Sequence, residues 1–393
     1  MKRFWDESKN LFNLMVKIRR ELHSHPEIDR ELTFTANLVE KHFKNNNIVF
    51  RRFPNNGIIV DIGKSKNKVI ALRADMDALT VQDMKDVPYK STVSGKMHAC
   101  GHDAHTAILI AVGILLKKIE DQLEGTVRLI FQPAEETDGG AQDMIEFGCL
   151  EGVDAIIGLH VDETTNIGEV ALKRGLVCAA SNPFTIKVAG KGSHGAYPHD
   201  GIDAILTGAR IIENLQTIVS REISPVSNAV ITIGTINGGT ALNAISRTVE
   251  MEGILRTVGD GLRKFCKERM TTIAKGTAQM MRGSAEINFV DGYPSFENDS
   301  DLAQSFVELV SSLDNILLKE IGFPSMGVED FAYYTKKVPG LYYKLGCRNE
   351  EKGITNPAHG SYFDIDEECM IIGCMLQSTF AYEFLNRRLN DGD

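Results

Sequence analysis

The alternation of apolar and polar positions divides the first part of the chain into short helices and strands. Apolar residues recur at helical spacing over residues 7–24, and Pro26 follows, so this segment predicts a helix. Short apolar runs bounded by Gly, Pro or Asn predict strands. The predicted elements are helices at 7–24, 32–46, 103–118 (with Asp103 as its cap) and 140–147, and strands at 58–62, 68–73, 126–131 and 155–159. Strands that alternate with helices indicate an α/β layer with a mainly parallel sheet.

The pattern changes near Cys178. Strands are expected at 184–189, 229–236, 247–257 and 285–290, and helices at 203–219 and 262–282. The order strand-helix-strand-strand-helix-strand is that of a ferredoxin-like α+β unit. We therefore expect an inserted domain over 179–292 within a discontinuous first domain, 1–178 and 293–393, whose last helix covers about 366–385.

The composition narrows the class of protein. A chain of 393 residues is too long for one ordinary core, which favours two domains. The net charge of −10 argues against nucleic acid or an anionic membrane as a partner, since both need a basic face. The longest apolar run, 107–116, is too short to cross a bilayer. The charged N-terminus is not that of a signal peptide, and seven irregularly spaced cysteines do not suggest a disulfide framework, so a cytoplasmic protein is expected.

The segment His98–His105 is the densest group of metal-binding side chains. It contains three His, one Cys and one Asp within eight residues. Thiolate and imidazole on one ion suit Zn²⁺ or a similar divalent cation. Cys100 and His102 alone would be weak evidence, because a buried Cys beside an ordinary His is common; Gly101 between them allows a tight turn.

The adjacent acids Glu135 and Glu136 strengthen that interpretation. Neighbouring Glu residues are usually solvated surface groups, but these follow a predicted strand and Pro133. Neighbours on a turning backbone point in different directions. One carboxylate can then bind a metal ion while the other accepts a proton from water, which is the division of labour in metal-assisted hydrolysis.

Further candidates follow other predicted strands. Asp75 and Asp77 are either turn residues or, as we favour, carboxylates that orient a metal-bound His. His160 ends the predicted strand 155–159, and His359 lies in a loop with turn signals; each alone means little. In open α/β sheets ligands bind beyond the carboxyl ends of the strands, so these residues are expected to share one cleft.

Three residues of the inserted domain are also candidates. His194 lies in a loop shaped by Gly and Pro, where it is either a surface residue or a donor to charge that develops on a carbonyl oxygen. Asn243 and Arg256 could bind a carboxylate, although a single Arg is usually a solvated charge.

With these motifs in order, the chain resembles the metal-dependent N-acyl-amino-acid amidohydrolases. That family includes hippurate hydrolases, bacterial aminoacylases and plant hydrolases of auxin–amino acid conjugates, within the aminoacylase and glutamate carboxypeptidase group of metallopeptidases. The matching segments are 19–23, 71–79, 98–105, 131–136, 158–161, 192–199, 326–331 and 359–363.

The resemblance implies a zinc-peptidase-like catalytic domain and a specific set of roles. It implies two divalent ions and the catalytic base at Glu135; the ligand types favour Mn or Zn, with Co or Ni as alternatives. It implies that the inserted domain is a lid and the interface of a homodimer, with His194 reaching the partner subunit's site, and that Asn243 and Arg256 hold the substrate's α-carboxylate. The implied metal ligands are Cys100, His102, Glu136, His160 and His359.

The expected activity is hydrolysis of the amide bond of a small N-acyl amino acid. Two alternatives remain open from the sequence. One is a dipeptidase or carboxypeptidase that uses the same binuclear site. The other is a non-catalytic, metal-dependent binding protein of this fold.

Overall fold

The computed structural model describes residues 2–386, which fall into two compact units. The first contains residues 2–175, 297–323 and 333–386, and the second contains 176–296 and 324–332. The sequence pattern predicts an inserted domain over 179–292. The second unit thus begins and ends a few residues outside that segment, and it also takes in a short stretch that the sequence places in the first domain.

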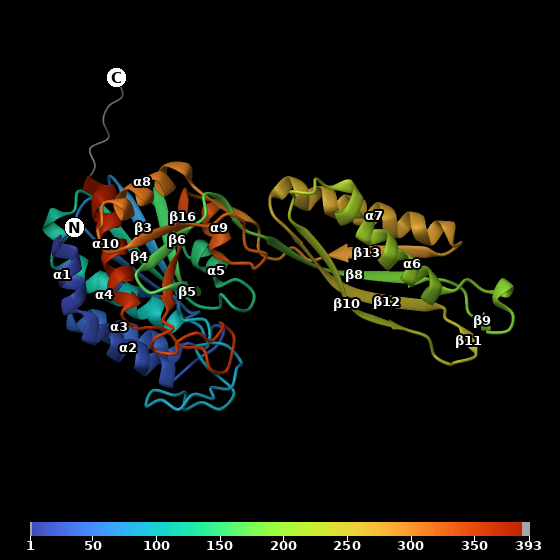
Figure 1. The fold of residues 1–393 in the computed structure, drawn as a ribbon, viewed down its shortest axis with the longest axis horizontal. Helices are drawn as coiled ribbons and strands as arrows, with labels where there is room; N and C mark the ends of the chain where they lie inside the picture. The colour runs from blue at the N-terminus through green and yellow to red at the C-terminus, as the bar shows by residue number, and fades with distance from the viewer. Residues whose placement is uncertain (1, 387–393) are drawn as a thin grey trace, which may run out of the picture. The chain divides into compact units, whose positions relative to one another are not determined.

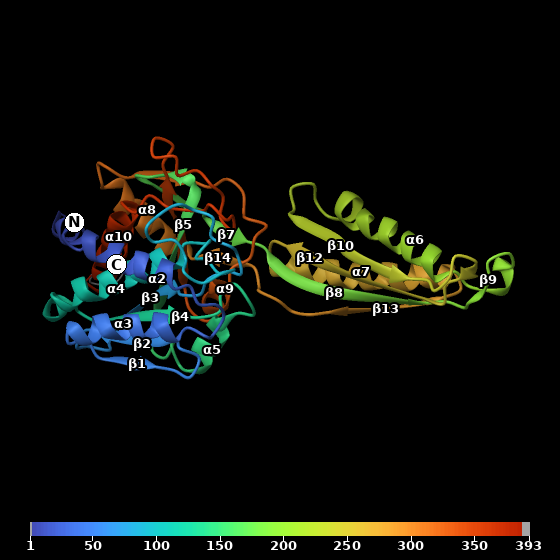
Figure 2. The same cartoon turned by 90° about the horizontal axis from the view of Figure 1, so that it is seen from below.

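The first unit is built on an eight-stranded sheet in the order β1-β2-β4-β3-β5-β16-β6-β15 (Figures 1 and 2). The neighbours β4, β3, β5 and β16 all run parallel, whereas β2 and β6 pair antiparallel to this central group. The strands are β1 (Phe50–Arg52), β2 (Ile58–Ile62), β3 (Val69–Asp75), β4 (Thr126–Gln132), β5 (Ala155–Asn166), β6 (Glu169–Leu172), β15 (Leu317–Glu320) and β16 (Gly340–Arg348). Both β3 and β4 are buried along their whole length, as expected for central strands covered on both faces.

Two apolar helices, α4 and α10, pack side by side against the centre of this sheet. Both are buried on almost every side, so each must be covered by further elements, and α1 and α2 pack on them (Figure 1). The helices of this unit are α1 (Lys2–Asn10), α2 (Phe12–Ser24), α3 (Thr33–Asn45), α4 (His102–Lys117), α5 (Gly140–Glu146), α8 (Ser300–Ser311) and α10 (Cys369–Asn386).

The second unit is a four-stranded antiparallel sheet in the order β10-β12-β8-β13, with α6 and α7 packed on it. Its elements follow the chain as β8 (Ala180–Ala189), α6 (Ala204–Thr217), β10 (Ala229–Gly238), β12 (Thr248–Thr257), α7 (Asp260–Met280) and β13 (Ser284–Phe289). Alternate side chains of the strands point into one small core shared with both helices. The predicted ferredoxin-like order of strands and helices is therefore present.

Short elements complete the two units. The chain passes between the units at β7 (Gly175–Cys178), at β14 (Phe296–Asn298), between Phe323 and Pro324, and at α9 (Phe331–Thr335). In the second unit β9 (Ser193–His194) and β11 (Ala244–Ile245) form a separate antiparallel pair. Among the residues described, none of the helices has the length and hydropathy needed to span a membrane.

Three local predictions are wrong. The predicted helix at 7–24 is two helices, α1 and α2, divided at Leu11. The predicted strand 155–159 continues to Asn166, because the polar residues that follow still pair with β16. Asp103 does not cap α4; the cap is Gly101 at φ 92°, and Asp103 lies inside the first turn. A side chain at Gly101 would also meet the Val161 side chain at 2.3 Å, so this turn requires glycine.

Candidate metal centre

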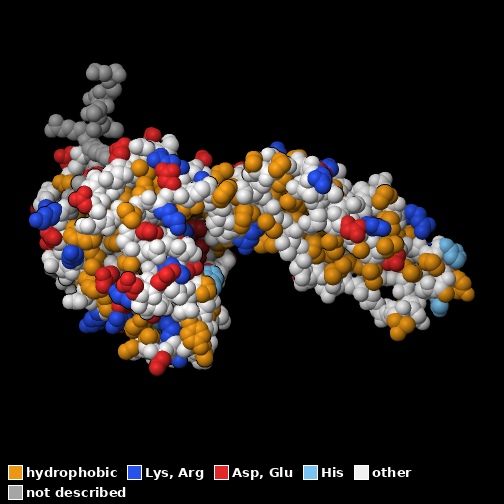
Figure 3. Space-filling view, viewed as in Figure 1, with side chains coloured by type: hydrophobic (Ala, Val, Ile, Leu, Met, Phe, Trp, Pro, Cys, Tyr) orange, Lys and Arg blue, Asp and Glu red, His pale blue; other side chains and the backbone are white. Residues whose placement is uncertain are grey.

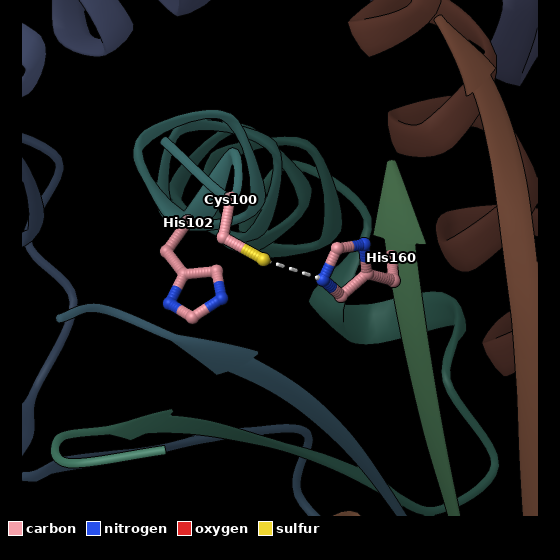
Figure 4. A group of neighbouring side chains, drawn as sticks. All are labelled: Cys100, His102 and His160. Atoms are coloured by element: carbon pink, nitrogen blue, oxygen red, sulfur yellow. Dashed lines mark hydrogen bonds between the residues drawn. The ribbon is translucent and has the colours of Figure 1, made fainter. Parts of the chain in front are cut away.

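Cys100, His102 and His160 converge from the start of α4 and from β5 (Figure 4). One ligand atom of each lies within 4.8 Å of the others. The Cys100 Sγ is 3.2 Å from His160 Nε2, and His160 Nδ1 donates to the Val161 carbonyl at 2.5 Å. That second bond leaves the Nε2 lone pair of His160 directed at the cluster, as a metal ligand requires.

Cys100 also belongs to a second group of three. Its sulfur, a Glu136 oxygen and a His359 nitrogen again lie within 4.8 Å of one another. The Nε2 of His359 is 3.5 Å from Glu136 Oε1. The two groups together contain the five predicted ligands, and they share the sulfur of Cys100.

The polar atoms of this cluster fit a cation. Within the described residues, both ring nitrogens of His102 and the Oε1 of Glu136 are buried and make no hydrogen bond. Buried polar atoms are normally satisfied, and an ion is one of the few partners that would satisfy all of these at once. Imidazole, carboxylate and thiolate are suitable ligands for zinc and manganese.

Burial and neighbouring charges shift the pKa values of three candidate ligands, Cys100, His102 and His160. Burial raises the pKa of the Cys100 thiol, and the carboxylates of Glu136 and Glu135 raise it further. Burial alone would lower the pKa of His102, but Asp75 and Asp77 outweigh it and hold that pKa above its usual value. Burial lowers the pKa of His160, with Lys344 adding to the effect, so this ring is neutral. A divalent cation would reverse the first two preferences, because it binds the thiolate and the neutral ring.

Asp77 holds the acidic pair in place. Its two carboxylate oxygens accept the backbone N–H groups of Glu135 at 3.1 Å and of Glu136 at 3.0 Å. Ala134, the residue before the pair, has a φ of 57°, and this turn directs the two N–H groups toward Asp77. The same carboxylate lies 3.4 Å from His102 Nδ1. Glu135, Glu136 and His102 form a further group within 4.8 Å, which places the predicted base beside the cluster.

Asp75 lies beside the cluster, with its Oδ2 3.7 Å from His102 Nε2, and it also binds His105, to which the sequence analysis gave no role. The Nδ1 of His105 donates to Asp75 at 2.6 Å, and its Nε2 accepts the Val161 N–H at 2.9 Å. Both ring nitrogens are therefore occupied, which excludes His105 as a ligand in this arrangement although it lies next to His102. The i, i+3 spacing from His102 on α4 was the available signal. Buried Arg73 pairs with Asp75 at 2.5 Å and compensates its charge.

His359 is placed by its backbone. It has a φ of 63°, which is uncommon for a residue other than glycine, and its N–H donates to the Ala99 carbonyl at 2.8 Å. The N–H of Ala358 donates to the Glu163 carboxylate at 3.1 Å. The His359 loop is thus attached both to the segment of Cys100 and to the end of β5.

The prediction that His160 lies just past the end of a strand is wrong. His160 is inside β5, beside Lys344 of β16 in the pairing register. It still reaches the cluster because β3, the other neighbour of β5, ends at Asp75, and the start of α4 occupies the space beyond that end.

The predicted residues of the inserted domain lie in the second unit and are not all together. His194 is in β9, opposite Ala244 of β11, and the Gly195 N–H donates to the Asn243 carbonyl at 2.7 Å. His194 and Asn243 are therefore neighbours. Arg256 lies at the far end of β12, where it donates to the Met326 carbonyl at 2.8 Å, so within this unit it does not join the other two.

Comparisons with known proteins agree on one family. The sequence profile of peptidase family M20/M25/M40 matches residues 71–383. Thermostable carboxypeptidase 2 of Saccharolobus solfataricus is 36% identical over 388 residues, covering 97% of this chain and 98% of that protein. The N-acetyl-L-cysteine deacetylase of Bacillus subtilis is 37% identical over 381 residues, covering 96% and 89%. The crystal structure of the Bacillus subtilis YXEP protein, described as a dinuclear metal-binding peptidase of the M20 family, matches with a TM-score of 0.85 at 33% identity, covering 96% and 99%.

Proposed function

Because the chain belongs to peptidase family M20/M25/M40, we propose that it hydrolyses the amide bond of N-acyl amino acids at a binuclear metal centre in its first unit. The products are a carboxylic acid and a free amino acid. The family resemblance and the fold class predicted from the sequence are both confirmed. The observation that carries the proposal is the pair of three-residue groups that share Cys100, with Glu135 beside them.

The side chains divide the work of hydrolysis. Cys100, His102 and His160 would hold one divalent ion, and Cys100, Glu136 and His359 the other. When bound, such ions supply Lewis-acid polarisation of the amide carbonyl and make water more acidic. Glu135 takes the proton of the water whose oxygen attacks the carbonyl carbon, and it returns this proton to the nitrogen when the C–N bond breaks.

The ligand set is compatible with several divalent ions. One thiolate favours a softer ion such as Zn²⁺, whereas the carboxylate and imidazoles also accept Mn²⁺. We therefore propose Zn²⁺ or Mn²⁺, with Co²⁺ or Ni²⁺ as functional substitutes. A cytoplasmic location is also part of the proposal and is supported by seven cysteines whose spacing is not that of a disulfide framework.

A homodimer through the second unit is the expected assembly. Strand β10 is at the edge of its sheet and pairs only with β12 among the described strands. Edge strands with apolar side chains are templates for pairing with another chain. Ile236 of β10 and Leu206 of α6 are about half exposed, and Figure 3 shows hydrophobic side chains along this part of the second unit. His194 and Asn243 would act from this unit, as donors to the oxyanion and to the substrate carboxylate; the same role for Arg256 is less favoured because its guanidinium already binds a backbone carbonyl.

A carboxypeptidase activity is the second candidate. It is favoured by the similarity to thermostable carboxypeptidase 2, which covers nearly the full length of both chains. The same centre would then cleave a peptide bond next to a C-terminal residue. The two activities differ in the group on the acyl side of the scissile bond.

Elemental analysis combined with a substrate panel tests the proposal. The purified protein should contain two divalent ions per chain. It should release amino acid from hippurate and N-acetyl amino acids faster than from dipeptides or blocked peptides, and Glu135→Gln should keep both ions and lose turnover. Preference for peptides would instead support the carboxypeptidase. A protein with two ions and no activity on any of these substrates would refute both.

A further inference from the structure

We propose that Arg19 is a positioning residue for the metal pair: it fastens the segment that carries His102 to the segment that carries His359. This inference rests on the proposed binuclear centre. It assigns a role to the 19–23 motif, which the hydrolytic mechanism does not use.

The guanidinium of Arg19 binds three carboxylates that come from two distant parts of the sequence. Its Nε donates to Asp103 Oδ2 at 2.9 Å, at the start of α4. Its Nη2 donates to Asp364 Oδ1 at 2.6 Å, and its Nη1 to Glu367 Oε1 at 3.2 Å. The side chains of Arg19 and Asp103 are fully buried. A planar guanidinium can serve several acceptors at fixed angles, which the single ammonium of a lysine cannot.

These acceptors lie close to the candidate ligands in the chain. Asp103 follows His102 directly, and Asp364 is on the segment that follows His359. Since Arg19 is fixed in the middle of α2, it sets the separation of the two segments from outside the cluster. His102 belongs to one group of three, and His359 to the other.

A second set of contacts supports the same segments. His23, one turn after Arg19 on α2, has its Nδ1 2.7 Å from Asp103 Oδ2, and Lys85 Nζ lies 3.0 Å from its Nε2. The same Lys85 ammonium donates to the Phe363 carbonyl at 2.9 Å. The connection from α4 to the segment after His359 is therefore made twice, both times through α2.

The geometry predicts an unequal effect on the two ions. The group Cys100–His102–His160 is built on the start of α4 and on β5, and both elements are buried in the core of the first unit. His359 lies on an exposed loop, and its side chain is more than half exposed. Loss of Arg19 should therefore weaken mainly the binding of the ion that has His359 as a ligand. Mutation of a residue that orients a metal ligand typically lowers metal affinity about 10–100-fold.

The neighbouring Arg20 provides a matched control. It lies on the same helix and binds Glu367 through two nitrogens, but its side chain is 45% exposed and it makes no hydrogen bond to Asp103 or Asp364 within the described residues. Full-length Arg19→Lys and Arg20→Lys carry the same chemical change at adjacent positions. Binding of Mn²⁺ is measured by equilibrium dialysis of the metal-free proteins, and folding by circular dichroism.

Arg20→Lys should bind two ions with the affinities of the unmodified protein. Arg19→Lys should bind one ion normally and the other about 10–100-fold more weakly, and excess Mn²⁺ should restore its activity. If Arg19→Lys does not fold, Asp364→Asn, which removes the acceptor at the His359 side, is judged by the same criterion. The inference would be overturned if the folded variant bound both ions with the affinities of the unmodified protein, or if both affinities fell by the same factor. Binding of fewer than two ions by the unmodified protein would refute the metal pair itself.

Discussion

Replacing Asp77 with Asn tests how Asp77 holds Glu135 and Glu136, because Asn has nearly the same size as Asp but cannot accept both N–H groups. Asp77 is 1% exposed, and each of its oxygens accepts one backbone N–H, from Glu135 and from Glu136. An asparagine keeps one acceptor and puts an NH₂ group where the other was. One N–H of the pair must then lose its partner and face a donor.

The size of the expected loss of stability follows from the cost of leaving one buried N–H group without a partner. A buried N–H without a partner costs about 1–3 kcal/mol, so Asp77→Asn should lower the free energy of unfolding of the first unit by about that amount. The carboxylate also lies 3.4 Å from His102 Nδ1, and its loss should weaken metal binding about 10–100-fold.

The sequence offers a selective probe for the assay. Its only tryptophan, Trp5, lies in α1, so tryptophan fluorescence during urea unfolding reports on the first unit and not on the second. Unfolding of the metal-free protein gives the stability, and equilibrium dialysis with Mn²⁺ gives the affinity. The exposed Asp86, changed to Asn, is the control for the loss of one negative charge nearby in the sequence.

A stable Asp77→Asn variant with unchanged metal affinity would refute the reasoning. It would mean that the turn at Ala134 holds the acidic pair by itself. A variant that loses stability but binds metal normally would limit Asp77 to a structural role.

Three further predictions concern the oxyanion, pH and assembly. His194→Ala should keep two ions and lose about 10²–10³ in kcat; unchanged kcat would exclude it as a donor to the transition state. Burial alone would raise the pKa of Asp364, but two neighbouring cations lower it, so its stabilising effect is present above about pH 4 and is lost below. The difference in urea stability between the unmodified protein and Asp364→Asn should therefore be large at pH 7 and shrink toward pH 3; a constant difference would contradict this. Ile236→Asp should convert a dimer to monomers in light scattering, whereas Val290→Asp, on an exposed position outside β10, should not.

Elements with a clear periodicity could be predicted from the sequence. The order of the second unit follows from alternating strands and from amphipathic helices such as α6, where Asp203 caps the helix by accepting two N–H groups. The continuation of β5 past His160 could not, because Asp162 and the polar residues after it resemble a loop until β16 is present as a partner. Local propensity does not record a pairing made by a strand far along the chain.

The sequence indicates the candidate ligands, but it does not indicate the side chains that hold them in place. Clustered His, Cys and Glu side chains predict a metal site, and the family resemblance implies the five ligands that we propose. The sequence predicts a helix cap at Asp103, because an aspartate just before a helix commonly accepts its first backbone N–H groups. Its carboxylate is instead taken by Arg19 and His23, which are about 80 residues away. Contacts of that range depend on the packing of α2 against α4.

The sulfur of Cys100 belongs to both groups of three, so a change at this one residue affects both groups. In the proposed binuclear centre, loss of the side chain of His160 or of His359 would remove a ligand from one ion and leave the ligand set of the other complete. Alkylation or oxidation of Cys100 would remove a ligand from both ions at the same time. Inactivation by a thiol reagent should therefore be all-or-none, with no population of molecules that retains one ion. Bound metal should protect against such a reagent, because the sulfur of Cys100 would already be coordinated.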